Sequence, residues 1–187
     1  MKNILSKTFV VAILTIIFFT ACSSGSGNSV TFNSIPEFQE WLSNQEANTI
    51  ASPYNVTLNL RDEDLEFHVL NYSEWLGNII NSTRRYVGIT LGSGITRVGD
   101  MAFSSCAFLI SINIPSTVTS IGDSAFLACV DLVSITFGST IPESNLHMYA
   151  FDRLGDLREK YIAGGAGTYT MTNQGTLFDP IRVWTRR

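Results

Sequence analysis

The chain has 187 residues, of which 45% are hydrophobic and 15% are charged, and its formal net charge at pH 7 is −4. This composition is too apolar for a disordered protein and too interrupted by polar residues for a protein with many membrane spans. Sixteen acidic residues oppose twelve basic ones without any basic stripe, which argues against a nucleic-acid partner.

The N-terminal residues have the pattern of an export signal followed by a tether. Lys2 and Lys7 give a positive start, and residues 8–21 are an apolar run without charge. That run falls short of the ~20 residues needed to span a membrane. We therefore expect residues 1–21 to be removed as a signal peptide, which leaves ten basic and sixteen acidic residues and a net charge of −6.

The end of this signal resembles the lipobox of bacterial lipoproteins. Small residues at 20 and 21 precede Cys22, and a Ser/Gly tract follows, although Phe19 stands where that family usually has Leu. The resemblance implies that Cys22 becomes the lipidated first residue and that residues 22–28 form a flexible tether. The alternative is an ordinary secretory signal with a chance cysteine.

Residues 29–85 predict an α/β segment that covers the start of the repeats described below. Ser34 and Glu37 form a capping box at the start of a helix with an apolar stripe. An alternating strand follows, and a second helix is expected to begin near residues 73–76. The apolar positions are Ile35, Phe38, Trp41 and Leu42, then Val56, Leu58 and Leu60, and then Ile79 and Ile80.

A repeat of 23 residues organises the middle of the chain. Residues 95–117 align without a gap on residues 118–140, with eleven identical positions, and Cys106 and Cys129 are the same position of the repeat. A partial repeat begins near Tyr86, and another follows with a two-residue insertion. A period of 20–29 residues with one strand in each unit is typical of a leucine-rich-repeat solenoid.

Each unit predicts a short strand and a turn. In the second unit, Ile135 and Phe137 face inward, while Ser134 and Thr136 face outward. A glycine and an aspartate then precede a short helical piece expected over residues 124–129. Phe103 and Phe126 are expected to stack in the interior beside the two cysteines.

These units resemble the BspA-like leucine-rich repeats of bacterial surface proteins. The resemblance rests on residues 121–126, Cys129 and residues 132–135 and on their counterparts from 98 to 112. The flanking segments resemble those of small spirochaete lipoproteins. We therefore predict an α/β fold, a short solenoid of about two full 23-residue repeats plus partial ones over 86–161. The N-terminal α/β cap is expected over 29–85 and an irregular C-terminal cap over 162–187, with Trp184 folded back on the last coil.

The sequence contains no recognisable catalytic, cofactor or metal motif. His68 and His147 have no other Cys or His at metal-ligand spacing. Cys106 and Cys129 are expected to be inert interior thiols. The acidic run 62–66 is expected to be a solvated loop rather than a calcium site, and Gly164–Gly167 is expected to be a turn. We therefore expect a protein that is not an enzyme.

Two columns of small polar residues are the candidate contact face. Three or four coils spaced by about 4.8 Å would make this face less than about 20 Å wide. Solenoids bind through extended surfaces of this kind, although a merely soluble outer face is the alternative for each residue. The outward-facing residues are Thr90, Ser111, Asn113, Ser134 and Thr136.

The resemblance implies a lipid-anchored protein at the cell surface, with the lipid on Cys22 in the outer membrane. It also implies adhesion to host extracellular-matrix proteins or to the surface proteins of other bacteria. A structural lipoprotein of the envelope without a host ligand is the alternative. An enzyme with an unrecognised site is a third and more remote hypothesis.

Overall fold

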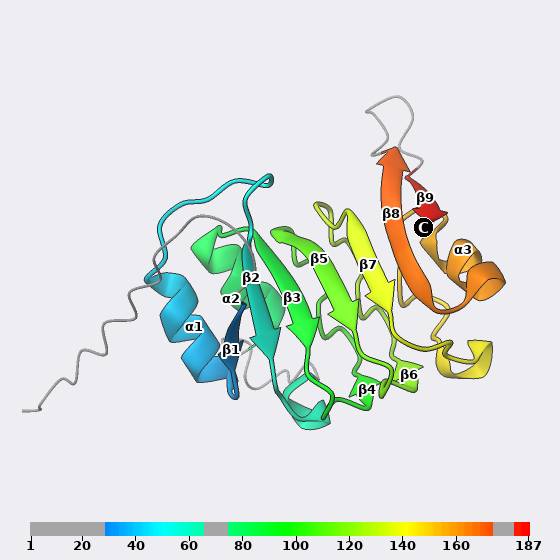
Figure 1. Ribbon diagram of the computed structural model, residues 1–187, viewed down its shortest axis with the longest axis horizontal. Helices are drawn as coiled ribbons and strands as arrows, with labels where there is room; N and C mark the ends of the chain where they lie inside the picture. Colours follow the sequence, from blue (N-terminus) through cyan, green and yellow to red (C-terminus); the bar gives the residue numbers. More distant parts are fainter. Residues whose placement is uncertain (1–28, 66–74, 174–181) are drawn as a thin grey trace, which may run out of the picture.

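The computed structural model describes residues 29–65, 75–173 and 182–187, and a sheet of seven strands runs along the long axis of this part of the molecule (Figure 1). The strand order is β1-β2-β3-β5-β7-β8-β9, and β4 and β6 form a second, two-stranded sheet. The strands are β1 (Val30–Phe32), β2 (Tyr54–Leu58), β3 (Val87–Leu91), β4 (Arg97–Val98), β5 (Leu109–Ile114), β6 (Ser120–Ile121), β7 (Ser134–Phe137), β8 (Gly167–Asn173) and β9 (Val183–Arg186).

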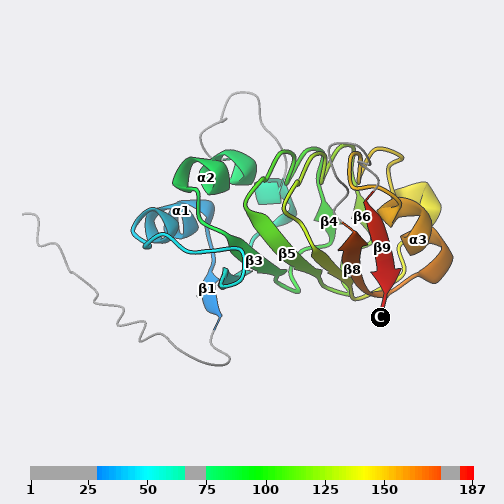
Figure 2. The ribbon, with the colours of Figure 1, turned by 90° about the horizontal axis from the view of Figure 1, so that it is seen from above.

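Short helices and turns lie beside this sheet and at its two ends (Figure 2). Within the described ranges, no helix has the length and apolar character needed to cross a membrane. The helices are α1 (Ile35–Ser43), α2 (Leu76–Thr83) and α3 (Leu157–Gly164), and the 3₁₀ turns are η1 (Asp62–Leu65) and η3 (Glu143–Asn145).

The large sheet is mostly parallel. Strands β1, β2, β3, β5 and β7 are parallel, whereas β8 and β9 are antiparallel to their neighbours. Ile89, Ile112 and Ile135 are register partners on β3, β5 and β7, one repeat apart. The result is a mixed α/β fold of the leucine-rich-repeat type, in which each 23-residue unit adds one strand.

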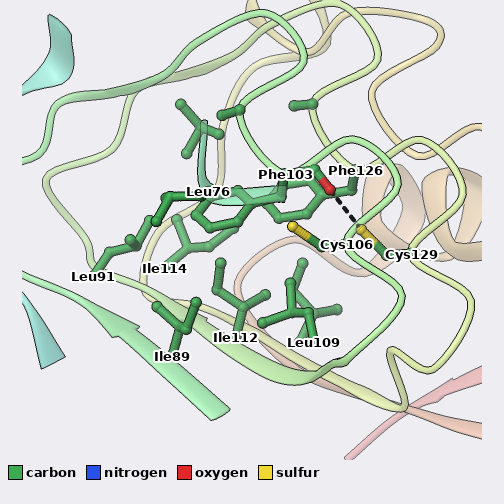
Figure 3. Close-up of a cluster of buried hydrophobic side chains, with 14 of the residues drawn as sticks. Leu76, Ile89, Leu91, Phe103, Cys106, Leu109, Ile112, Ile114, Phe126 and Cys129 are labelled. Carbon is green, nitrogen blue, oxygen red and sulfur yellow. Dashed lines mark hydrogen bonds between the residues drawn. The ribbon is translucent and has the colours of Figure 1, made fainter. Parts of the chain in front are cut away.

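The core lies between the large sheet and the turns of each unit (Figure 3). Phe103 and Phe126 stack with ring centroids 5.2 Å apart, and Phe151 continues the stack at 5.6 Å from Phe126. Cys106 and Cys129 are fully buried free thiols beside these rings. The sequence-based prediction for this part of the core is therefore confirmed.

The helical piece predicted over residues 124–129 is wrong, since this segment is a series of turns. Two of its donors bond to the next unit: the Phe126 N–H donates to the Ala150 carbonyl (2.8 Å) and the Ala128 N–H to the Asp152 carbonyl (3.2 Å). The donors between them close tight turns within the segment, from the Leu127 N–H to the Ser124 carbonyl and from the Cys129 N–H to the Phe126 carbonyl. Ser124 and Ala128 have positive φ angles of 53° and 57°. Stacked units offer acceptors one strand spacing away, so alternate N–H groups bond to the next unit and the segment does not continue as a helix.

Helix α1 begins as the capping box predicts. The Ser34 Oγ accepts the Glu37 N–H (3.4 Å), and the Glu37 Oε2 accepts the N–H of Asn33 (3.2 Å), one residue before the cap. The buried face consists of Ile35, Phe38 and Leu42. This helix lies at the β1 end of the sheet (Figure 1).

Helix α2 lies against the first full unit and hydrogen bonds to its turns. The Trp75 Nε1 donates to the carbonyls of Met101 (2.9 Å) and Ala102 (3.2 Å). Ala125, the residue equivalent to Ala102 in the next unit, has its carbonyl occupied by the backbone N–H of Phe103 (2.8 Å). In the first full unit, the Trp75 side chain thus takes the place of the backbone donor that the preceding unit supplies elsewhere in the stack.

Asn81 of α2 makes a second link to the same unit. Its Nδ2 donates to the Ser105 carbonyl (2.6 Å), and its Oδ1 accepts the Ala107 N–H (2.9 Å). At the other end of the molecule, Trp184 is buried and its Nε1 donates to the Leu154 carbonyl (2.6 Å). At both ends of the repeat stack, side chains therefore form hydrogen bonds with backbone groups of the end units.

Candidate interaction face

The five residues predicted to face outward lie next to one another on the large sheet. Thr90, Asn113 and Thr136 are register partners on β3, β5 and β7, and Ser111 pairs with Ser134 on β5 and β7. Asn113 is exposed and the other four are half-buried. The inward positions between them are buried isoleucines, so the alternation turns these polar side chains to one face.

The same face continues beyond the predicted residues in both directions. Strands β1 and β2 extend it on one side, and β8 and β9 extend it on the other. We define the Thr row as Thr31, Thr57, Thr90, Asn113, Thr136 and Thr168. We define the Ser row as Asn55, Gly88, Ser111, Ser134, Thr170 and Thr185.

The sequence reasoning missed the contribution of the flanking strands. Seven strands at about 4.8 Å give a face about 29 Å wide, more than the width expected from three or four coils. One signal was available: Val56-Thr57-Leu58 has the pattern of Ile89-Thr90-Leu91. Its offset of 33 residues lies outside the 23-residue period, so the repeat alone does not reveal it.

Neither row contains a charged side chain. Toward the sheet ends, hydroxyl groups are occupied: the Thr136 and Thr168 Oγ1 atoms lie 2.9 Å apart, and the Arg187 Nε donates to the Thr170 Oγ1 (3.1 Å). Nearer the centre, several side chains have no hydrogen-bond partner among the described residues. These side chains are Thr90, Ser111, Asn113 and Ser134.

Gly88 is the one position of the Ser row without a side chain, and its neighbours extend over it. A Cβ at Gly88 would lie 2.5 Å from the Asn55 Oδ1 and 2.7 Å from the Ser111 Oγ, which is closer than real Cβ contacts. The absence of a side chain thus allows the amide from β2 and the hydroxyl from β5 to approach each other across β3. The Ser row is polar along its length for this reason.

The acidic run contains a structural carboxylate at Asp62. Its Oδ1 accepts the N–H groups of Thr96 (2.7 Å) and Arg97 (3.1 Å), and its Oδ2 accepts the Thr96 hydroxyl. Partial burial alone would raise the pKa of Asp62, but the hydrogen bonds from Thr96 and Arg97 outweigh it and lower the pKa. Asp62 therefore holds the start of β4 rather than only solvating a loop.

The other candidates for chemistry do not assemble a reactive site in the part of the chain that the structure describes. His147 lies with its Nδ1 3.1 Å from the Asp123 Oδ1. No group of three Cys, His, Asp or Glu side chains in the described ranges could hold a metal ion. His68 and Cys22 lie outside the described residues.

The two buried cysteines lack the surroundings of a nucleophile. The Cys129 Sγ donates to the Phe103 carbonyl (3.0 Å). Burial raises the pKa of the Cys129 thiol to about 12 and also raises the pKa of the Cys106 thiol well above its ordinary value. Since the thiolate is the reactive species, both thiols act as packing groups.

Comparison with known families agrees with this geometry. Residues 77–164 match the BspA type leucine rich repeat region in six copies. These residues form a BspA-type leucine-rich repeat region. Regions of this kind generally mediate protein–protein binding, are typically non-enzymatic, and occur in surface or secreted proteins. No curated protein and no solved structure matches the chain.

Proposed function

We propose that this chain is a lipid-anchored cell-surface protein that binds other proteins through the Thr row and the Ser row. The observation that supports this most is the continuity of uncharged polar side chains across seven paired strands. Host extracellular-matrix proteins and the surface proteins of neighbouring bacteria are the proposed partners. The proposed result of binding is adhesion.

The chemistry of the rows suits a protein partner with a neutral polar surface. The unpartnered groups at the centre, such as the Asn113 amide and the Thr90 hydroxyl, can exchange hydrogen bonds with water for hydrogen bonds with a ligand. At the centre of the rows no ionic group has to be desolvated, and the Arg187 guanidinium adjoins the Ser row at its β9 end, at Thr170. We therefore expect binding that depends little on salt concentration.

The dimensions of the rows predict weak binding by one copy. A width of about 29 Å and a strand length of about 15 Å give roughly 400 Å², about half the ~800 Å² that each partner contributes to a standard interface. Many anchored copies on one cell would bind together and raise the effective affinity. Micromolar monovalent affinity and strong binding by clustered copies are expected.

The hydrogen bonds at the two edges of the large sheet favour binding through the Thr row and the Ser row over binding in which a partner adds a strand to the sheet. β1 has only three residues, and the Asn33 N–H that follows it is occupied by Glu37. At β9, Asp156 accepts the Trp184 N–H (2.8 Å) and donates its own N–H to the Arg182 carbonyl (3.2 Å). A partner strand would find few free backbone groups at either edge.

The anchor and the solenoid form are part of the same proposal. We propose a lipid on Cys22, a tether over 22–28 that reaches at most about 25 Å, and a solenoid over 86–161. Residues 29–85 and 162–187 act in this proposal as its caps, and the location is the outer surface of the outer membrane. The links from Trp75 and Asn81 to the first unit support the capping role.

The test compares the full chain with an Asn113→Arg, Thr136→Arg double variant. Both proteins are purified in detergent, clustered on beads and incubated with immobilised fibronectin, fibrinogen and neighbouring bacteria. The matched control is Met101→Arg, Met148→Arg, which adds the same charge at exposed positions on the turns. Circular dichroism verifies that all three proteins are folded.

We expect the wild type and the control to bind at least one target and the face variant to lose most binding. Equal binding by the face variant would place the site elsewhere on the molecule. If the clustered wild type binds none of the targets, the adhesion proposal fails and a structural lipoprotein of the envelope becomes the better explanation.

A further inference from the structure

The two ends of the parallel strands differ in chemistry. Strands β2, β3, β5 and β7 run in the same direction, so their N-terminal ends meet at one edge of the face and their C-terminal ends at the other (Figure 1). After β3, β5 and β7 the chain contains only glycine, serine, threonine and proline, at residues 92–94, 115–117 and 138–140. The segments before the strands carry aliphatic and aromatic residues. The face therefore has one small polar edge and one apolar edge.

We define the apolar rim as Ile50, Tyr86, Phe108, Val130 and Val133, which lie in the segments that lead into β2, β3, β5 and β7. Ile50 is 42% exposed and Val130 is 50% exposed, and the other three are half-buried. The Tyr86 and Phe108 rings are in contact, with centroids 5.1 Å apart. Tyr86 and Val133 lie outside the core cluster, so core packing does not account for them. Exposed apolar residues gathered in this way, unlike single ones, mark interaction surfaces.

The apolar rim borders the Ser row directly. Val133 precedes Ser134 of that row in the chain, and Ile110 precedes Ser111. The Val133 N–H donates to the Ile110 carbonyl (2.9 Å), so the two strands remain paired at this edge. The rim and the Ser row are thus adjoining parts of one surface.

The loop that carries Ile50 is fixed beside β3 by a side chain. The Asn48 Nδ2 donates to the Tyr86 carbonyl (2.8 Å), and the Asn48 Oδ1 accepts the Tyr86 N–H (2.9 Å). Ile50 follows Asn48 by two residues. This part of the rim is therefore in place before a partner arrives, which lowers the entropy that binding costs.

Charges of both signs lie around the rim. The Arg85 Nε donates to the Gln45 carbonyl (2.9 Å), which places this guanidinium next to the residue that precedes Glu46. At the β7 end, the Arg182 guanidinium donates to the Val130 carbonyl and interacts with the Asp131 carboxylate. Neither sign dominates, so the rim offers apolar contact rather than a net charge that would select a partner. The charged residues around the rim are Arg84, Arg85, Glu46, Asp131 and Arg182.

We propose that the apolar rim and the Ser row form one docking surface for a protein partner that presents aliphatic or aromatic side chains beside neutral polar groups. This inference rests on the proposed function and names the chemistry of its partner. The Thr row and the Ser row supply only about half of the ~800 Å² that each side contributes to a standard interface. The rim crosses four strands spaced by about 4.8 Å and supplies part of the missing area.

The composition of protein interfaces favours such a partner. Their buried centres are apolar and enriched in aromatic residues, and polar groups surround them. A partner with neutral polar groups alone would leave Tyr86, Val130 and Ile50 in water and would gain nothing from them. The partner is therefore bound in one orientation, with its apolar side chains at the N-terminal ends of the strands.

The test compares the full chain with a rim variant, Ile50→Asp and Val130→Asp, whose changed side chains are exposed, so that the fold is kept. The matched control is Met148→Asp and Ile162→Asp, which adds the same charge at exposed apolar positions outside the rim. These proteins and the face variant are clustered on beads, washed free of detergent and incubated with immobilised fibronectin, fibrinogen and neighbouring bacteria. Sedimentation velocity of the unclustered wild type and rim variant measures self-association.

We expect the control to bind a target as the wild type does and the rim variant to bind it at least about tenfold more weakly, because a few anchoring side chains carry most of the energy of an interface. A rim variant that binds like the control, while the face variant does not bind, would overturn this inference and leave the proposed function standing. If the clustered wild type binds no target, both fail. Self-association of the wild type that the rim variant loses would also overturn the inference, because a second copy would then occupy the rim.

Discussion

The rings of Phe103 and Phe126 lie almost parallel, with an interplanar angle of 2° and centroids 5.2 Å apart. They occupy the same position in consecutive units, so their stacking is a direct result of the 23-residue register. Phe151 adds a third ring to the stack. Phe126 is therefore packed on both faces by aromatic neighbours.

Replacing Phe126 with Ala should lower the free energy of unfolding by about 3–5 kcal/mol, because the change leaves a cavity between two rings. Thermal or urea unfolding followed by circular dichroism measures the effect. Thr136→Ala, on the outer face, is the control and should lower stability by only about 1 kcal/mol, because it removes one hydrogen bond, to the Thr168 hydroxyl, and leaves no cavity in the core. Similar small losses for both variants would contradict the packing described here.

Asn81→Ala should destabilise the first unit by about 1–3 kcal/mol, because it removes a donor to the Ser105 carbonyl and leaves the Ala107 N–H without its acceptor. Asn44→Ala, which removes one exposed bond to the Glu40 carbonyl, is the matched control. Hydrogen exchange should locate the loss of protection in residues 101–107. A uniform loss of protection across the chain, or no loss in residues 101–107, would argue against a local stabilising role of Asn81.

Acid should weaken the attachment of β4 through Asp62. The pKa of Asp62 is lower in the folded state than its ordinary value of about 3.9, so its contribution to stability is fully present above that value. This contribution is lost as the pH falls through the lower, folded pKa. Asp62→Asn should therefore reduce stability at neutral pH and flatten the dependence of stability on pH between about 2 and 5. If the wild type and the variant lose stability in parallel over this range, Asp62 does not carry the effect.

Cys106 and Cys129 should resist alkylation while the protein is folded. With the pKa of Cys129 near 12, and that of Cys106 also raised by burial, almost no thiolate is present at pH 8. In a Cys22→Ser variant, iodoacetamide should label neither residue in buffer and both in concentrated urea, as read by mass spectrometry. Rapid labelling in buffer would show that the repeat interior opens easily.

Replacing Cys22 with Ser should release the protein from the membrane fraction and abolish labelling by radioactive palmitate. Each buried CH₂ contributes about 0.8 kcal/mol, so two or three acyl chains anchor a protein stably and their loss frees it. A Ser23→Ala variant, which keeps the cysteine, is the control. Palmitate labelling that persists in the Cys22→Ser protein would rule out lipid attachment at this residue.

The interior of the repeats could be predicted from the sequence because one residue period fixes both register and burial. Positions such as Cys106 and Cys129 recur every 23 residues, and a recurring apolar position in stacked units must face the core. The five outward residues followed from the same alternation. Local pattern and tertiary packing agree in this part of the chain.

The turns and the flanking strands could not be predicted in the same way. The choice between a helix and a turn over residues 124–129 depends on acceptors in the next unit, such as the Ala150 carbonyl, which lie far away in sequence. Strands β1, β2, β8 and β9 join the large sheet without sharing the 23-residue period. The full extent of the Thr row and the Ser row is thus a property of tertiary pairing.

The hydrogen bonds between units make the array extendable by duplication. The backbone bond from Phe103 to Ala125 recurs from Phe126 to Ala150, so an inserted copy of residues 118–140 would find the same donors and acceptors on both sides. Each inserted copy would lengthen the sheet by about 4.8 Å and leave Asn81 and Trp184 in their places. Unequal recombination between the two similar coding segments could then change the area of the sheet face in steps of 23 codons, while the side chains that hydrogen bond to the two end units stay the same.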